Sequence, residues 1–112
     1  MPRAVRSRAE RPPDPRVFRA LADPTRQKIL QILGAGEMRA GDIAKRFRSR
    51  RPTISKHLKV LRDAGLVEVR ASGRERYYSV APGPLREATA RMQAVEEMMR
   101  GGVERLGGFL DR

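Results

Sequence analysis

The sequence has 112 residues, enough for one domain with a single core and too few for two. Its formal net charge is +12 and its pI is about 11.5, which is typical of a nucleic-acid-binding protein; a ribosomal or merely soluble basic protein is the alternative. Cys is absent, which excludes disulfides, thiolate metal sites and thiol catalysis. No apolar run approaches the ~18 residues of a membrane span, and no apolar stretch follows the basic N-terminus as a secretory signal would require. We therefore expect a cytoplasmic protein of bacterial type with no membrane partner.

Residues 1–16 are predicted to form a disordered basic arm, and residues 17–112 the folded domain. The arm holds four of the eight prolines and five arginines, and it shows no hydrophobic periodicity. It can touch phosphates or a minor groove, or it can be a solvated tail.

The first helices can be placed by their start and stop signals. Structure is expected from Val17–Ala22 onward. Asp23 followed by Pro24 is a favourable helix start, with the Asp as N-cap, and Gly34–Gly36 should end that helix. A second short helix is predicted over Ala40–Phe47, with Ile43 and Phe47 turned inward.

The segment 43–62 is the most informative part of the chain. It holds eight Lys or Arg residues, one His and no acid. Within it, Ile54, Leu58 and Leu61 follow the spacing of a helix with one buried face, and Gly65 suits a left-handed cap after a helix over Pro52–Ala64. Ser49 is the candidate N-cap. A short basic helix with hydroxyl side chains fits the major groove of double-stranded DNA.

A β-hairpin is predicted after the basic helix. Residues 66–70 and Glu75–Val80 have strand-like composition, and Gly73 lies in the turn between them. One of Tyr77 and Tyr78 should face the core and the other should face outward, because side chains alternate along a strand.

The last helix, expected to start near Leu85, carries apolar residues at steps of three and four, as in a coiled-coil seam. The seam resumes beyond Gly101-Gly102, a pair that should kink, fray or end the first segment. A seam can pack on its own domain, on a second copy or on a foreign protein. A dimer interface is favoured because the preceding domain is small and has its own core. The residues assigned to it are Val17, Leu21, Leu85, Ala88, Met92, Val95 and Met99.

These features together resemble the ArsR/SmtB-type winged-helix repressors. The resemblance rests on Leu21–Arg26, Gly41–Ala44, Thr53–Leu61, and Ala64–Val67 with Gly73-Arg74 and Tyr77-Tyr78. It implies a mainly α-helical winged helix-turn-helix fold with a small β-hairpin wing, in the order α-α-(β)-α-α-β-β-α. It also implies a homodimeric repressor on an inverted-repeat operator.

Within that family, the chain looks most like the metal-independent, autorepressor-like branch. Relatives that sense thiophilic metals carry a Cys pair at the positions of Arg39 and Gly41, and neither residue can bind a metal. The last helix has carboxylates but no His, so no transition-metal site and no cofactor is expected.

The predicted DNA-binding residues lie on the basic helix, in the linker before it and on the wing. Six of them have a plainer interpretation: helix capping for Thr53 and Ser55, a solvated face for Lys56 and Lys59, a structural histidine for His57, and an ion pair with Glu75 or Glu68 for Arg76. The full set is Arg48, Arg50, Arg51, Thr53, Ser55, Lys56, His57, Lys59, Arg74 and Arg76.

No catalytic residues are predicted. The chain has a single His, no Cys, no phosphate-binding glycine loop and no carboxylate pair in an apolar setting. Two other functions stay open beside sequence-specific regulation: a non-specific architectural or RNA-binding winged helix, and a protein-interaction module.

Overall fold

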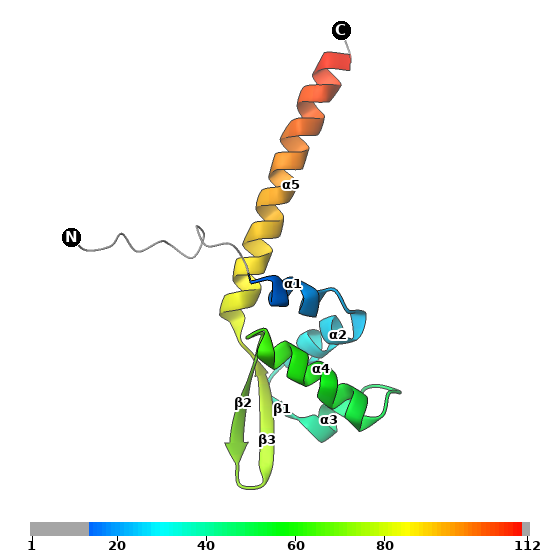
Figure 1. Ribbon diagram of the computed structural model, residues 1–112, viewed down its shortest axis with the longest axis vertical. Coiled ribbons are helices and arrows are strands. Elements are labelled where there is room, and N and C mark those ends of the chain that lie inside the picture. The colour runs from blue at the N-terminus through cyan, green and yellow to red at the C-terminus, as the bar shows by residue number, and fades with distance from the viewer. Residues whose placement is uncertain (1–13, 111–112) are drawn as a thin grey trace, which may run out of the picture. The chain divides into compact units, whose positions relative to one another are not determined.

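The computed structural model describes the backbone of residues 14–110 and the side chains of residues 14–102. The elements follow the expected order (Figure 1). They are α1 (Pro15–Leu21), α2 (Pro24–Leu33), β1 (Met38–Arg39), α3 (Ala40–Ala44), α4 (Arg51–Asp63), β2 (Val67–Ser72), β3 (Glu75–Val80) and α5 (Pro82–Leu110). Residues 14–85 form one compact unit, and residues from Arg86 onward belong to a second unit.

An Asp-Pro pair starts each of the first two helices. Asp23 accepts a hydrogen bond from the backbone N–H of Arg26 (3.1 Å), as predicted for α2. Asp14 accepts one from the backbone N–H of Arg16 (2.9 Å), so α1 begins at Pro15, two residues before the expected position. The sequence signal was the same at both places, because Asp14-Pro15 repeats Asp23-Pro24. The disordered arm was predicted over residues 1–16, so its last three residues are corrected to the N-cap and first turn of α1, and residues 1–13 lie outside the described residues.

Helix α3 is shorter than predicted, since it ends at Ala44 and not at Phe47. Arg46 and Phe47 continue the chain in tight turns, in which each backbone N–H donates to the carbonyl three residues earlier (3.0 and 3.1 Å). Phe47 is half-buried. The ammonium nitrogen of Lys28 lies over its ring, 5.4 Å from the ring centre.

Helix α4 ends in a Schellman motif, with Gly65 as the left-handed cap that the sequence predicted. Gly65 has a φ of 76°, which only glycine adopts readily. The N–H of Leu66 donates to the carbonyl of Leu61, and that of Gly65 donates to the carbonyl of Arg62, both at 2.9 Å. This reversal sends the chain directly from α4 into β2.

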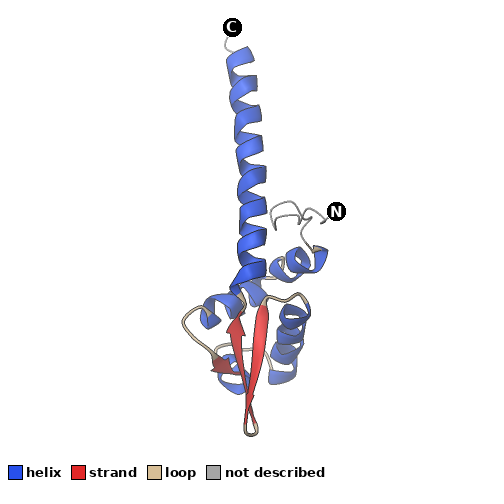
Figure 2. Ribbon diagram, turned by 90° about the vertical axis from the view of Figure 1, so that its left-hand side faces the viewer, coloured by secondary structure: helices blue, strands red, loops and turns tan. Residues whose placement is uncertain are grey.

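The sheet is antiparallel, in the order β1-β3-β2. Strands β2 and β3 form a hairpin, here called the wing (residues 67–80), with Val67 opposite Val80 and Ser72 opposite Glu75 (Figure 2). The two-residue turn has Gly73 at its first central position with a φ of 60°, as a type II′ turn requires. Strand β1 pairs Met38 with Tyr78, which attaches the start of α3 to the wing.

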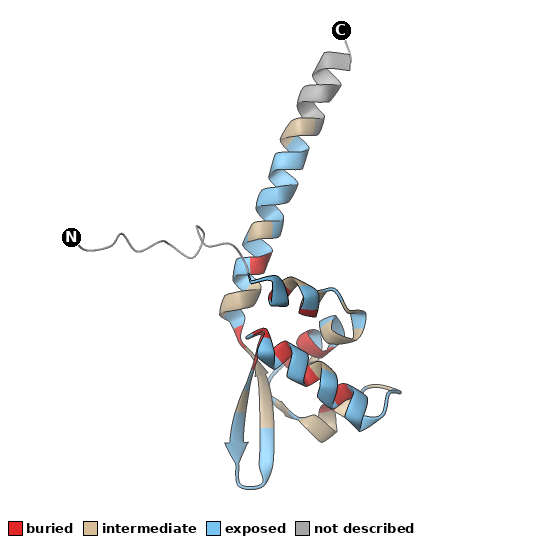
Figure 3. Cartoon of the chain, in the orientation of Figure 1, coloured by how far each residue is buried: buried red, intermediate tan, exposed pale blue. Residues whose placement is uncertain are grey.

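The core of residues 14–85 lies where the helices and the base of the wing face one another. In Figure 3 the buried positions of α2 and α4 lie on the sides of these helices that face the interior, and the tip of the wing is exposed. Ile54, Leu58 and Leu61 are at most 1% exposed, so the predicted buried face of α4 is confirmed. The fully buried large side chains are Ile29, Ile43, Ile54, Leu58, Leu61 and Leu66.

Helix α5 differs from prediction at its start and near its end. It begins at Pro82 and not near Leu85, and it runs without a break through Gly101 and Gly102 to Leu110. Each glycine costs a helix only about 1 kcal/mol relative to Ala, which is too little to end a long helix. The predicted continuation of the seam at Val103, Leu106 and Leu110 falls where side chains are not described.

Candidate DNA-binding surface

The outward side of α4 is basic and exposed. Its first turn holds no acid, and its last turn holds Arg62. Lys56 and Lys59 project opposite the buried face, Arg51 and Ser55 lie on one flank, and Thr53 and His57 lie on the other. Nine of the ten predicted DNA-binding residues are exposed: Arg48, Arg50, Arg51, Thr53, Ser55, Lys56, Lys59, Arg74 and Arg76.

The start of α4 is not capped by a side chain. Arg50 is the N-cap residue, and its side chain makes no capping hydrogen bond, so the prediction that Ser49 caps this helix is wrong. Pro52 in the first turn supplies the correct φ and has no N–H to satisfy, which lets α4 begin without a capping oxygen. The guanidinium groups of Arg50 and Arg51 therefore stand beside an end of the helix that attracts anions.

His57 is the one predicted DNA-binding residue that is half-buried. Its Nδ1 lies 3.3 Å from Nη1 of Arg26 on α2. Because a guanidinium can only donate, Nδ1 of His57 is the acceptor, and the ring proton is on Nε2. His57 therefore has a structural role through Nδ1, which contacts Arg26.

Two acids near the basic surface, Glu37 and Asp42, are paired with arginines. Glu37 pairs with Arg70 on β2 (2.6 Å), and Asp42 pairs with Arg39 on β1 (3.1 Å). In each pair, the hydrogen bond from the arginine side chain lowers the pKa of the carboxyl group. These acids stay ionised and paired at neutral pH, so they do not neutralise the cations of α4.

The wing brings further arginines to the same surface. Arg74 occupies the tip, and Arg76 follows on the same face of β3. Arg76 forms no ion pair with Glu75 or Glu68; Glu75 lies 3.7 Å from Arg39 instead. Arg51, Ser55, Arg74 and Arg76 line one hollow, and Arg39 and Tyr78 line it with them.

The two tyrosines of the wing lie on opposite faces, as predicted: Tyr78 is opposite the half-buried Val69, and Tyr77 is opposite the exposed Arg70. Both rings are half-buried. The guanidinium of Arg70 lies 4.8 Å from the ring centre of Tyr77, which covers that ring on one side. Tyr78 faces the hollow beside Arg51 and Ser55. Strand β1 pairs with β3 at both residues, Met38 with Tyr78 and Arg39 with Tyr77.

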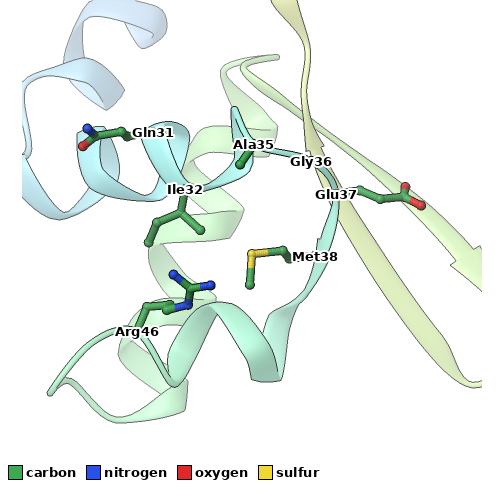
Figure 4. A pocket seen from close by; sticks show the side chains of 7 residues that line it. All are labelled: Gln31, Ile32, Ala35, Gly36, Glu37, Met38 and Arg46. Atoms are coloured by element: carbon green, nitrogen blue, oxygen red, sulfur yellow. The ribbon is translucent and has the colours of Figure 1, made fainter.

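A second hollow, of about 240 Å³, lies between α2, the loop after it and the turn after α3. In Figure 4 the side chains of Ile32, Met38 and Arg46 point toward one another, and Glu37 points away from them. This hollow shares no residue with the predicted DNA-binding set, and we assign it no role in DNA binding.

Helix α5 carries the other candidate surface. Four of the five exposed large apolar residues in the described part of the chain lie on it: Met92, Val95, Met98 and Met99, with exposed fractions of 52%, 45%, 75% and 65%. Three of these belong to the predicted interface. Val17 and Ala88, also predicted for it, are already buried in the single chain and have little surface left for a second copy. Leu21 and Leu85 are half-buried.

The described residues contain no group of three or more His, Cys, Asp or Glu side chains that could hold a metal ion. Arg39 and Gly41 stand in β1 and α3, and the side chain of Arg39 is held by Asp42. None of the described helices is long and apolar enough to cross a membrane.

Comparison with known proteins places this fold. Residues 21–70 match a family of helix-turn-helix domains. The chain is 47% identical to the transcriptional repressor SdpR of Bacillus subtilis over 64 residues, which cover 57% of this chain and 71% of that protein. The structure of an ArsR-like transcriptional regulator from Rhodococcus sp. RHA1 aligns with a TM-score of 0.75 and 30% identity, over 86% of this chain and 88% of that one. This chain belongs to the ArsR family of winged helix-turn-helix transcriptional regulators.

A third relative is a homodimer. The homodimeric winged helix-turn-helix DNA-binding domain of a possible ArsR-family regulator from Mycobacterium bovis aligns with a TM-score of 0.60 and 33% identity, over 76% of this chain and 81% of that one. In this ArsR-family protein, α3 and α4 are the helix-turn-helix and the β2–β3 hairpin is the wing. The fold and family expected from the sequence are therefore confirmed, and the chain is a DNA-binding transcriptional regulator.

Proposed function

We propose that this protein is a homodimeric repressor that reads an inverted-repeat operator through α4. The observation that carries the proposal is the exposed, unpaired basic face of α4, flanked by hydroxyl side chains in its first turns. Lys56 and Lys59 form no ion pair with any described residue, so both are available to phosphates or guanine edges. Thr53 and Ser55 stand near the start of the helix, the part that reaches base edges when such helices dock.

Helix α5 supplies the proposed dimer interface. Met92, Val95 and Met99 follow steps of three and four, so they form one stripe along the helix. Exposed apolar stripes of this kind mark association surfaces. Because a twofold interface uses the same surface on both partners, two copies of this stripe can pair with each other. The homodimeric relative from Mycobacterium bovis supports this assembly.

Dimerisation gives the operator its form. Two copies of α4 related by a twofold axis would enter successive major grooves about 34 Å apart, which is one turn of DNA. The operator would then be an inverted repeat. Repression would follow from occupying it, in line with the relative that is named a repressor.

We also propose that this regulator works without a bound metal or cofactor and has no enzyme activity. The positions that hold a metal-binding Cys pair in metal-sensing relatives are occupied by Arg39 and Gly41. Arg39 uses its guanidinium to hold Asp42 and lies near Glu75. Metal addition should therefore leave operator binding unchanged.

Selection from a pool of random duplexes tests the proposal, with the molar mass of the free protein measured in parallel. The expected result is enrichment of one inverted repeat, with half-sites about one helical turn apart, by a protein of twice the chain mass. Failure to enrich any sequence would favour a non-specific architectural or RNA-binding protein. Enrichment of a single half-site by a monomer would contradict the dimer.

A further inference from the structure

A hollow of about 240 Å³ lies between the wing and the first half of α4. Its walls come from three separate segments: β1 with the start of α3, the first turns of α4, and the wing. The basic and hydroxyl side chains that line it are Arg39, Arg51, Ser55, Arg74, Arg76 and Tyr78. Glu75 is the one acid among the residues that line it, and it lies 3.7 Å from Arg39.

The fold holds these side chains in place from several sides. Arg51 and Ser55 are four residues apart, so they share the flank of α4 that faces the wing. The guanidinium of Arg51 lies against Gly41, where a Cβ would be 3.9 Å from its Cζ and Nη1. Arg74, Arg76 and Tyr78 alternate along the chain and so share one face of the wing.

Arg39 is fixed independently of the other arginines. Its Nε donates to Asp42 (3.1 Å), and its Nη1 lies 3.7 Å from Glu75. Because Asp42 and Glu75 engage this one guanidinium, they leave Arg51, Arg74 and Arg76 without an ion pair to any described residue. Three like charges around one hollow repel one another, and an anion placed between them would remove that repulsion.

Double-stranded DNA supplies an anion at this place. The major and minor grooves are separated by a sugar–phosphate strand, so a protein with a helix in one groove and a wing in the next must have that strand between them. We propose that this hollow binds one backbone phosphate of that strand, held by the arginines of α4 and the wing, with the hydroxyl groups of Ser55 and Tyr78 as further donors. This inference rests on the proposed docking of α4 in the major groove. It adds Tyr78 to the DNA-binding residues, while Arg39 stays paired with Asp42 and Glu75.

The site would link the two DNA-reading elements. A phosphate seated between Arg51 and Arg74 fixes the distance from α4 to the tip of the wing. It therefore sets the register of the helix in its groove without reading any base.

The test uses the full chain and the duplex that selection recovers, in which single phosphates are replaced by uncharged methylphosphonates, one linkage at a time. For the wild type, one linkage per half-site should stand out, with affinity reduced about tenfold. Arg74→Ala and Tyr78→Phe should each weaken binding to the unmodified duplex and reduce the extra loss at that linkage, because each removes one of the donors to that phosphate. Arg62→Ala, which removes an equal charge from the far end of α4, should keep the linkage effect.

The possible outcomes separate this site from the proposed function. The wild type could show a sensitive linkage whose loss of affinity is the same in Arg74→Ala and Tyr78→Phe. That result would overturn the phosphate site but would not contradict the proposed function as a regulator. Equal binding to all duplexes, with a flat scan, would overturn both. A flat scan together with saturable binding of inorganic phosphate that Arg74→Ala removes would assign the hollow to a free anion and overturn its occupation by DNA.

Discussion

Arg26 on α2 and His57 on α4 lie 3.3 Å apart, measured from Nη1 to Nδ1. The same guanidinium donates to the carbonyl of Ala20 (2.8 Å) and to that of Arg19 (3.0 Å) at the end of α1. One side chain thus joins α1, α2 and α4. It orients the flank of the recognition helix that carries Thr53 and leaves Nε2 of His57 as the donor still available to a phosphate.

Replacing Arg26 should destabilise the fold more than its partial exposure suggests. Its side chain is 17% exposed, and Arg26→Ala removes three hydrogen bonds while leaving two carbonyls with no partner from this side chain. We expect a loss of about 2 kcal/mol in the free energy of unfolding, measured by urea denaturation. Gln31→Ala, an exposed change on the same helix, is the control. Equal urea midpoints for the two variants would show that the guanidinium of Arg26 does not stabilise the fold.

The N-cap of α2 should make stability depend on pH. The backbone N–H of Arg26 lowers the pKa of Asp23 below its ordinary value of 3.8. The ionised form therefore stabilises the folded state above that value, and the contribution is lost as the pH falls through the lower pKa of the folded state. Asp23→Asn keeps a capping oxygen but removes the charge. The melting temperature of the wild type should exceed that of the variant at pH 6, with the gap narrowing below about pH 4. A gap independent of pH would contradict this assignment.

Two substitutions on α4 should separate affinity from specificity. Lys56→Ala should reduce the slope of log affinity against log salt by about 1, if Lys56 meets a phosphate. Thr53→Ala should relax the preference at one base position about tenfold. Arg19→Ala, which removes an equal charge from α1, serves as the control in gel-shift titrations. If both α4 variants bound the selected duplex as strongly as the wild type, α4 would not be the recognition helix.

The stripe on α5 should control assembly. Val95→Glu places a charge in the proposed interface, where it would be buried without a partner, so the dimer should dissociate and operator binding should weaken with it. Ala90→Glu adds the same charge on the opposite side of the helix and should leave the molar mass unchanged. Sedimentation equilibrium distinguishes the two cases. A dimer that survives Val95→Glu would place the interface elsewhere.

The parts of the fold that depend on local signals could be predicted from the sequence. The buried face of α4 follows from the spacing of Ile54, Leu58 and Leu61. The turn at Gly65 and the turn at Gly73 follow from the need for positive φ. The order of elements also matched, because hydrophobic period and turn residues are properties of neighbouring positions.

Features that depend on distant residues could not be predicted in this way. Nothing near Arg39 or Tyr78 indicates that they share a hollow with Arg51, since that follows from the pairing of β1 with β3 and the placement of α4. The link between Arg26 and His57 spans 31 positions and likewise has no local sign. The end of α3 was misplaced because Phe47 is apolar and fits a helix period, although the chain there has already left the helix.

The most direct test of the account is the affinity of the wild-type protein for the selected duplex and for a scrambled duplex of equal length, both at about 150 mM salt. A sequence-specific regulator should prefer the first about a thousandfold or more. Equal affinity for the two duplexes would contradict sequence-specific reading by α4 and would leave the positive charge as a means of general nucleic-acid binding.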